Sequence, residues 1–319
     1  METGFSGMGN ALLDLRKIQN KNYVNLFGED MTEQQRIQAI AKDIENELPK
    51  MKFQSTSNKL SWFGSDDNLG FVDQIARLGV IAEVFLEGEE IRSPSVQATI
   101  DPEISDPYKV AIISTHEQIL KGQIYQGCIN PASDEYRTKI VAYAKRIGYS
   151  LLSQGVVGHF SVDFIASRKN DSWDLVASEI NLRQGGTTHT CCTMLALCRG
   201  SVKNGMFYTD KGEHRCYEAT DNFYDSRLKG LCPHEFLNSF RNTVDKDVLC
   251  LHWNEIERTG VVFHIISLLQ FGKIGFTAIG RNAEEARNLF SKTKIFLENL
   301  ATVKNVYLKY DETTSRNVN

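Results

Sequence analysis

Two strand-like runs around a short polar segment constrain the fold of this chain more than any other feature. Residues 160–166 and 173–181 are both rich in β-branched and aromatic residues, and the polar stretch Ser167–Ser172 lies between them. Two such runs separated by turn-forming residues predict a β-hairpin. The residue types suited to chemistry are concentrated on this hairpin and directly after it.

Polar side chains alternate along the second predicted strand. Because successive side chains of a strand point to opposite faces, Glu179, Asn181 and Arg183 project to the same side. Mg²⁺ prefers oxygen ligands and usually takes one or two carboxylates together with phosphates. The sequence therefore predicts Asp163, Glu179 and Asn181 as metal ligands, and Arg183 as the catalytic residue that meets a phosphate.

This metal site depends on the register of the hairpin. Asp163 lies on the first strand, and a slip of one residue would move it to the face opposite Glu179. The prediction thus requires that Asp163 and Glu179 share a face. The alternative is an ordinary solvated strand that carries charges.

A run of small residues follows the hairpin. Gln184–His189 supplies glycines and threonine hydroxyls directly before a predicted helix, where the free N–H groups of a helix start can bind an anion. Gly186 and Thr187 are therefore candidate substrate contacts. The alternative, compatible with the first, is a tight connection between strand and helix, with Thr187 or Thr188 as the helix cap.

A second glycine-rich segment lies near the start of the chain. Its backbone N–H groups are suited to covering phosphates, although it has neither the Gly-Lys-Ser/Thr of a Walker A loop nor a preceding strand. The alternative is a plain loop. The candidate nucleotide-binding residues in this segment are Gly4, Ser6, Gly7, Gly9 and Asn10.

Three further polar residues are candidate substrate contacts. Arg92 follows a predicted strand, and the alternative is an exposed arginine with no ligand. His116 ends another predicted strand, with a structural role as the alternative. Ser161 falls on the face of Asp163 and is placed to touch a substrate if that face is a site.

The other predicted elements follow from apolar periodicity and turn residues. Residues 260–269 are apolar throughout and fit either a helix or a buried strand. Asp101–Pro107 is the most turn-rich segment and predicts a boundary between lobes. Helices are predicted at residues 11–19, 32–47, 136–153, 188–197 and 283–300, and strands at 80–86, 95–100, 109–114 and 275–280.

Composition excludes several classes of protein. The chain has 319 residues, 41% of them hydrophobic, which suits about two globular domains. A net charge of −4 argues against general binding to nucleic acids or anionic membranes. The scattered, odd number of seven cysteines is typical of reduced thiols, and no apolar run reaches the ~20 residues of a membrane span. These features predict a cytoplasmic protein.

Five segments, taken together and in order, resemble the ATP-grasp superfamily. The resemblance is to the pheganomycin-type peptide ligases and to the ATP-grasp domain of IQ-motif-containing protein H, and it covers most of the chain. The matching segments are GFSGMGNALLDLR, EVFLEGEEIRSPSVQ, STHEQIL, GHFSVDF and SEINLRQGGTTH.

The resemblance implies an α+β fold in which two lobes clasp ATP between antiparallel sheets, followed by a C-terminal α/β extension. Residues 1–105 would form the small lobe and residues 106–215 the large lobe with the metal site. Residues 216–319 would complete the large lobe, with a disordered tail from about residue 310. The hinge strand that contacts adenine would comprise Glu83, Val84, Phe85 and Leu86, and Glu90 would hold the ribose.

The activity that the resemblance implies is ATP-dependent ligation of a carboxylate to an amine or peptide, through an acyl phosphate, with ATP and Mg²⁺ as cofactors. A lysine precedes the glycine loop in the family, whereas this chain begins three residues before Gly4. This departure leads us to expect either an N-terminal truncation or an impaired nucleotide site. The alternative functions are an ATP-binding regulatory or interaction module, and a kinase that stops at phosphoryl transfer.

Overall fold

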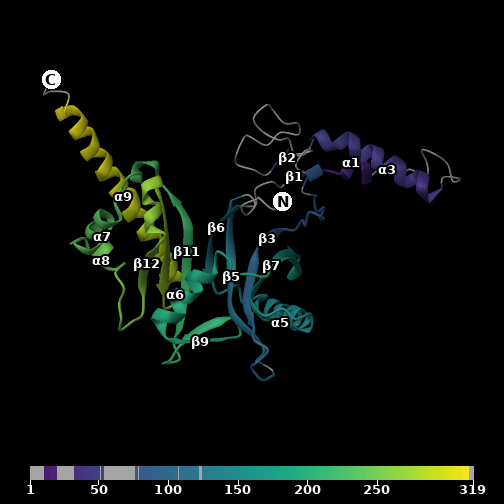
Figure 1. Ribbon diagram of the computed structural model, residues 1–319, viewed down its shortest axis with the longest axis horizontal. Coiled ribbons are helices and arrows are strands. Elements are labelled where there is room, and N and C mark those ends of the chain that lie inside the picture. The colour runs from purple at the N-terminus through teal and green to yellow at the C-terminus, as the bar shows by residue number, and fades with distance from the viewer. Residues whose placement is uncertain are drawn as a thin grey trace. The chain divides into compact units, whose positions relative to one another are not determined.

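The computed structural model describes residues 11–19, 32–50, 52–53, 76–77, 79–106, 108–121 and 124–315. The chain divides into two compact units (Figure 1). Unit 1 consists of Met1–Phe85 with Lys121–Tyr125, and unit 2 consists of Leu86–Leu120 with Gln126–Asn319.

Unit 1 contains a small sheet and a capped helix. Strands β1 (Ala11–Leu12) and β2 (Lys52–Phe53) pair antiparallel, α1 (Arg16–Gln19) follows β1, and α3 (Glu33–Glu47) leads into the 3₁₀ turn η1 (Leu48–Lys50). A capping box starts α3, because the Thr32 hydroxyl accepts from the Gln35 N–H and the Gln35 amide oxygen accepts from the Thr32 N–H. The helix predicted at 32–47 is confirmed. The helix predicted at 11–19 is confirmed only for its last turn.

The predicted strand at residues 80–86 is wrong. Residues 79–88 have no strand assignment, and no described strand pairs with them. The apolar side chains of Val80, Ile81 and Val84 are 63%, 85% and 84% exposed. An apolar run becomes a strand only when a neighbour takes up its N–H and C=O groups, and the described chain supplies none here.

Unit 2 is organised around an antiparallel sheet of eleven strands in the described chain. Its main path runs β12, β13, β11, β6, β5, β4, β7 and β3, while β8 pairs with β7 and the β9–β10 hairpin pairs with β11. The strands are β3 (Glu90–Arg92), β4 (Pro94–Ile100), β5 (Val110–Lys121), β6 (Ile124–Asn130), β7 (Gly158–Lys169), β8 (Ser172–Asn181), β9 (Gly200–Lys203), β10 (Met206–Thr209), β11 (His214–Tyr224), β12 (Gly260–His264) and β13 (Lys273–Gly280).

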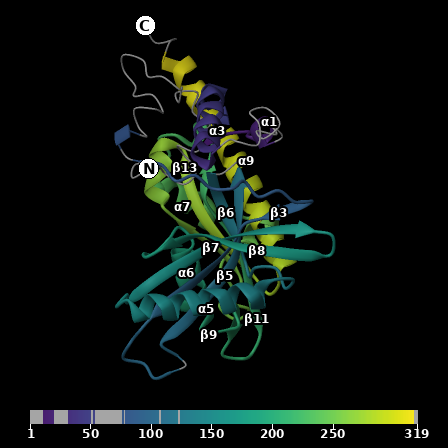
Figure 2. The same ribbon diagram turned by 90° about the vertical axis from the view of Figure 1, so that its right-hand side faces the viewer.

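Helix α5 (Arg137–Ser153) covers one face of β4 and β7 (Figure 2). Its apolar stripe includes Ile140 and Ala144, both fully buried, and packs against Phe160 and Val162 of β7. The helix approaches so closely at Gly148 that a Cβ atom there would lie 2.5 Å from Val110 and 2.8 Å from Phe160. The helix predicted at 136–153 is confirmed, and the glycine explains its contact with the sheet.

A second core lies between β11–β13 and the C-terminal helices. These helices are α7 (Pro233–Arg241), α8 (Lys246–Leu249) and α9 (Ala283–Ser315), with the 3₁₀ turns η2 (Ser226–Leu228) and η3 (Ile266–Phe271) beside them. Aromatic rings dominate this core, and Phe263 contacts both Phe236 and Phe240 edge to face. The buried cluster includes Leu228, Phe236, Phe240, Leu251, Leu269, Ile274, Phe276 and Leu297.

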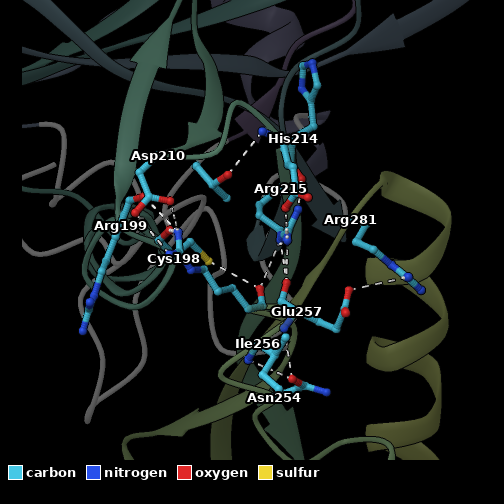
Figure 3. A network of polar contacts seen from close by, with 12 residues as sticks. Cys198, Arg199, Asp210, His214, Arg215, Asn254, Ile256, Glu257 and Arg281 are labelled. Atoms are coloured by element: carbon cyan, nitrogen blue, oxygen red, sulfur yellow. Dashed lines mark hydrogen bonds and ion pairs between the residues drawn. The ribbon is translucent and has the colours of Figure 1, made fainter.

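Polar contacts tie the end of α6 (Thr188–Cys198) to the loops around β10–β12 (Figure 3). The buried Arg215 guanidinium donates from Nε to the Glu257 carbonyl, 3.1 Å away. Arg258 donates to the Cys198 carbonyl and to the Asp210 carboxylate, each at 2.6 Å. Two backbone carbonyls of these loops thus receive charge-assisted hydrogen bonds from arginines.

Most of the predicted unit 2 elements are present, including the hairpin, the strands at 95–100, 109–114 and 275–280, and the helix at 188–197. Residues 260–269, which fit helix or strand, contain β12 followed by η3. Residues 101–109 connect the paired strands β4 and β5, so the turn-rich segment lies inside unit 2. The three-part division predicted from the sequence stays a prediction.

The C-terminal helix is longer than expected. Helix α9 continues to Ser315, so residues 310–315, which were expected to belong to a disordered tail, are helical. No helix in the described ranges is long and apolar enough to cross a membrane.

Candidate functional site

The register of the central strands aligns four polar residues across the sheet. His116 of β5 lies opposite Ser95 of β4, Ser95 lies opposite Asp163 of β7, and Asp163 lies opposite Glu179 of β8. Directly opposed residues of neighbouring strands place their side chains on the same face. We call these four residues the Asp163 row. The prediction that Asp163 and Glu179 share a face is confirmed.

A second polar row runs beside the first. Ser114, Gln97, Ser161 and Asn181 are aligned on the same four strands, each two residues from a member of the Asp163 row. Both rows therefore occupy one face of the sheet, which we call the polar face. The register is irregular directly after Gln97 in the pairing of β4 with β5, and directly after Asp163 in the pairing of β7 with β8. Each row therefore borders a bulge.

The opposite face of these strands is apolar. Phe160, Val162 and Phe164 alternate with Ser161 and Asp163 along β7, and all three are buried in the core beneath α5. One strand thus contributes to the core and to the polar face, since its side chains alternate with a period of two.

Burial decreases along the Asp163 row. His116 and Ser95 are 0% and 2% exposed, Asp163 is half-buried and Glu179 is exposed. The row therefore opens to solvent at β8, where its two carboxylates lie.

The carboxylate of Asp163 is held by short polar contacts. Ser95 Oγ donates to Oδ1 at 2.6 Å, and Asn181 Nδ2 lies 3.5 Å from Oδ2. Burial raises the pKa of Asp163, and the charge of Glu179 raises it further, while Ser95, Gln118 and Arg183 act in the opposite direction. A positive ion bound between Asp163 and Glu179 would offset both effects: it would stabilise the buried Asp163 carboxylate and neutralise its repulsion by Glu179.

The donor set of the polar face fits magnesium. It offers two carboxylates and one amide oxygen, and the described residues contain no group of three or more His, Cys, Asp or Glu that could hold a metal. Mg²⁺ commonly takes one or two carboxylates and completes its shell with phosphate oxygens and water. Asp163, Glu179 and Asn181 therefore suit a metal that arrives with phosphates better than a metal enclosed by protein.

Arg183 lies directly after β8, beyond the two carboxylates. Its side chain is exposed, and Nη1 donates to the carbonyl of Gln184 at 3.2 Å. Its positive charge lowers the pKa of Asp163, so the guanidinium is close enough to interact with that carboxylate. A cation beside two carboxylates is suited to bind phosphate oxygens.

The loop before α6 is fixed to the polar face through Gln97. The Gln97 amide oxygen accepts from the Thr188 hydroxyl at 2.7 Å, and its amide nitrogen donates to the Thr187 hydroxyl. The Gly185 N–H donates to the Thr188 hydroxyl at 2.9 Å. Thr187 occupies the cap position of α6 without a capping hydrogen bond from its side chain, and Gly186 is exposed beside it. The glycine-rich connection is thus positioned next to Ser161 and Asn181.

The structure does not bring Glu90 and Arg92 to this site. They pair with Arg168 and Ala166 of β7, so they lie on the face covered by α5. Arg92 Nε donates to the Glu90 carboxylate at 2.7 Å, and its guanidinium lies 4.6 Å above the ring of Trp173. Glu90 also lies 3.4 Å from Arg168, so its carboxylate is engaged in ion pairs.

His116 and Ser161 share the polar face with Asp163 but are buried. Burial lowers the pKa of His116 to about 4, so its imidazole is neutral at neutral pH. The Ser114 hydroxyl lies 3.3 Å from Nδ1, and Nε2 has no hydrogen-bond partner in the described chain. Ser161 is 5% exposed. Both predicted substrate contacts therefore lie beneath the surface of the site.

The structure does not test the predicted nucleotide-binding residues. Gly4, Ser6, Gly7, Gly9 and Asn10 lie outside the described residues. Glu83, Val84 and Phe85 belong to unit 1, and Leu86 is the first residue of unit 2. Their roles stay predictions.

Comparison with known families decides the family. Residues 1–203 match the model described as IQCH-like, ATP-grasp, which is more than half of the chain. The chain belongs to the IQCH-like ATP-grasp family. The α+β architecture is accordingly an ATP-grasp fold, and the predicted superfamily is confirmed. Residues 251–293 also match the model described as PGM1 C-terminal domain.

One curated relative of this ATP-grasp chain is a ligase. The L-propargylglycine–L-glutamate ligase of Streptantibioticus cattleyicolor is 30% identical over 218 residues, which is 68% of this chain and 42% of the ligase. The chain thus spans less than half the length of this relative.

Solved ATP-grasp structures are more distant. An N5-carboxyaminoimidazole synthetase from Staphylococcus aureus in complex with ADP has 16% identity and a TM-score of 0.41, covering 66% of this chain and 50% of its own. An ADP complex of an N5-carboxyaminoimidazole ribonucleotide synthetase has 15% identity and a TM-score of 0.44, covering 81% and 64%. These likenesses are too distant to bear on substrate or reaction.

Sequence reasoning missed two residues of the candidate site. Ser95 binds the Asp163 carboxylate and Gln97 anchors the loop before α6. Both are polar residues two positions apart on a largely buried strand, in the segment Pro94–Ile100. That alternation is the signal that marks a second polar strand beside Asp163.

Proposed function

We propose that this chain is an ATP-dependent ligase that joins a small carboxylate to an amine, with ATP and Mg²⁺ as cofactors and the cytoplasm as its location. The observation that carries the proposal is the register that sets Asp163 directly opposite Glu179 on a polar face, with Asn181 and Arg183 beside them. ATP-grasp membership and the likeness to a ligase support it.

Asp163, Glu179 and Asn181 would hold the metal in this reaction. Bound Mg²⁺ would supply positive charge that offsets the charge of the ATP phosphates. Ser95 would keep the Asp163 carboxylate oriented through its hydrogen bond. Gln97 would keep the Gly185–Thr188 connection against the same face.

The proposed reaction needs no nucleophilic side chain. A substrate carboxylate would attack the γ-phosphate of ATP and release ADP, and an amine would then lose a proton and displace phosphate from the resulting acyl phosphate to form the amide. Arg183 would stabilise the negative charge that develops during phosphoryl transfer, as preorganised cations do. Most of the remaining rate enhancement would come from holding the reactants in position.

A second candidate function is a nucleotide-binding module without catalysis. Glu90, the residue expected to hold ribose, lies on the face opposite Asp163 and is paired with Arg92 and Arg168. This placement favours an altered nucleotide site. The two candidates differ in whether substrates stimulate release of ADP.

The experiment measures ADP release and amide formation with Mg-ATP and pools of amino acids and short peptides. In Glu179→Gln, we expect substrate-dependent turnover to fall by about 100-fold or more, because electrostatic contacts to a transition state are typically worth that much. Asp174→Asn removes an exposed carboxylate from the same strand and should leave turnover unchanged. Equal turnover of Glu179→Gln and the unaltered chain would refute the metal site. ATP binding without any substrate-dependent ADP would favour the module.

A further inference from the structure

Two histidines and an aspartate meet beside the start of α6, away from the Asp163 row. His264 ends β12, Asp221 belongs to β11, and Gly275 of β13 lies between these two strands. His189, in the first turn of α6, packs its ring edge to face against His264 with 4.5 Å between the ring centres. Three adjacent strands and one helix therefore contribute to a single cluster, which we call the His264 cluster.

The backbone around the His264 cluster leaves room for these side chains. A Cβ atom on Gly275 would lie 2.4 Å from two atoms of the His264 ring and 3.1 Å from the Cα of Asp221. No side chain fits at position 275 without displacing the imidazole. The pairing of β11 with β13 is irregular between Thr220 and Phe223, which places Asp221 in a bulge. Bulges change the direction of side chains and are frequent beside functional sites.

The cluster combines a carboxylate, which accepts hydrogen bonds, with two imidazoles, each of which has one accepting nitrogen when it is neutral. His264 Nε2 is buried without a hydrogen-bond partner in the described chain. Burial lowers the pKa of His264 to about 4, and it also lowers the pKa of His189, against which the charge of Asp221 acts. Both imidazoles are therefore uncharged at neutral pH, and Asp221 supplies a negative charge. Asn222 Nδ2 donates to Asp221 Oδ1 at 2.8 Å and holds this carboxylate in place.

The cluster is continuous with the proposed ligase site through the chain itself. Thr188, the residue before His189, is bonded to Gln97 on the polar face. A ligand held by His189 would thus lie close to the connection that carries Gly186 and Thr187. In a carboxylate–amine ligase, the two substrates must be held beside each other. In the function proposed above, the Asp163 row binds the metal and phosphates that activate the carboxylate, which leaves the amine to be held nearby.

We propose that Asp221, His264 and His189 bind the ammonium group of the amine substrate. A carboxylate gives the counter-charge that an ammonium ion requires, and an uncharged imidazole nitrogen accepts one of its hydrogens. This role accounts for the unpaired Nε2 of His264, and the lack of a side chain at Gly275 provides the space that the His264 ring occupies. The assignment of the ligand as a substrate rests on the ligase function proposed above, whereas the binding of an ammonium group does not.

The test uses glycinamide, which carries an ammonium group, and glycolamide, in which a hydroxyl replaces it. The histidine imidazole resonances of the whole 319-residue chain are followed by NMR at constant ionic strength, without ATP or magnesium, and are assigned with His189→Gln and His264→Gln. We expect saturable shifts of the His189 and His264 resonances with glycinamide and none with glycolamide. Equal shifts with both compounds, or no saturable shift with glycinamide, would overturn the proposal.

Two variants make the assignment to this cluster specific. Asp221→Asn keeps the shape of the side chain, and we expect it to weaken glycinamide binding by about tenfold or more, since a hydrogen bond to a charged group is worth that much. Gly275→Ala removes no polar group but displaces the His264 ring, so binding should weaken as well. Asp174→Asn should bind as the unaltered chain does. Unchanged affinity in both Asp221→Asn and Gly275→Ala would also overturn the proposal.

The outcome is independent of the nucleotide site. Because no ATP or metal is present, failure of glycinamide binding leaves the magnesium site at Asp163 and Glu179 untouched. In turn, if Glu179→Gln keeps full turnover and the metal site is refuted, the glycinamide measurement still tests whether the His264 cluster binds an ammonium group.

Discussion

Asp163 is a residue whose position favours function over stability. It is half-buried, its pKa is raised by burial and by the facing Glu179, and the compensating bonds from Ser95 and Gln118 and the charge of Arg183 do not cancel that effect. A raised pKa means that the ionised form is disfavoured in the folded chain. Residues at binding sites often carry such a cost, which the ligand removes.

This cost predicts how stability depends on pH. Since the folded chain holds a proton on Asp163 more readily than the unfolded chain, the free energy of unfolding falls as pH rises from 3.8, the ordinary value, through the raised pKa. Asp163→Asn does not titrate, so it should unfold at a higher temperature than the unaltered chain at pH 7. The difference should shrink as the pH is lowered toward 4, as measured by thermal unfolding without metal. A lower unfolding temperature for Asp163→Asn at pH 7 would contradict this account.

At the scale of elements, alternation along β7 assigns one face to the core and the other to the site. Phe160 and Val162 pack beneath α5, while Ser161 and Asp163 face away from it. The helix can lie this close to the sheet because Gly148 has no side chain. The position of β7, and with it Asp163, therefore depends on the packing of α5.

Gly148→Ala tests that packing. A methyl group at this position collides with Val110 and Phe160, and overpacking of a core typically costs about 1–3 kcal/mol, partly offset by the better helix propensity of alanine. We expect the free energy of unfolding, measured with urea, to fall by about 1–2 kcal/mol. Ser150→Ala, at an exposed position of the same helix, should change it by less than about 0.5 kcal/mol. A more stable Gly148→Ala variant would show that the helix is less closely packed than described.

At the scale of the whole molecule, binding of a ligand to the folded chain adds to its stability. A ligand that binds only the folded chain stabilises it by about 2.7 kcal/mol when present at 100 times its dissociation constant. If Asp163, Glu179 and Asn181 hold magnesium, the stabilisation by ATP must depend on both the metal and these side chains.

Thermal unfolding with Mg-ATP measures this linkage. We expect saturating Mg-ATP to raise the unfolding temperature by about 5–10 °C, since 1 kcal/mol corresponds to about 2–4 °C for a domain of this size. ATP with EDTA, or Mg-ATP with Glu179→Gln, should have little effect, whereas Asp174→Asn should respond as the unaltered chain does. An equal rise in Glu179→Gln would place the metal elsewhere.

Local sequence determined the elements and the faces of the site. Periodicity predicted α5, the small polar residues at Gln184–His189 predicted the start of α6, turn residues predicted the β7–β8 hairpin, and alternation placed Glu179 and Asn181 on one face. Each of these inferences depends on neighbours within a few residues. The membership of the ATP-grasp superfamily also followed from local segments.

Only the tertiary structure decided how distant strands are arranged. The register between β7 and β8 put Asp163 opposite Glu179, and the pairing of β3 with β7 put Glu90 on the other face. Residues 80–86 have the composition of a strand but no partner among the described strands. The physical reason is the same in each case: a strand forms through hydrogen bonds to a neighbour, and neither the neighbour nor the register is encoded within the strand itself.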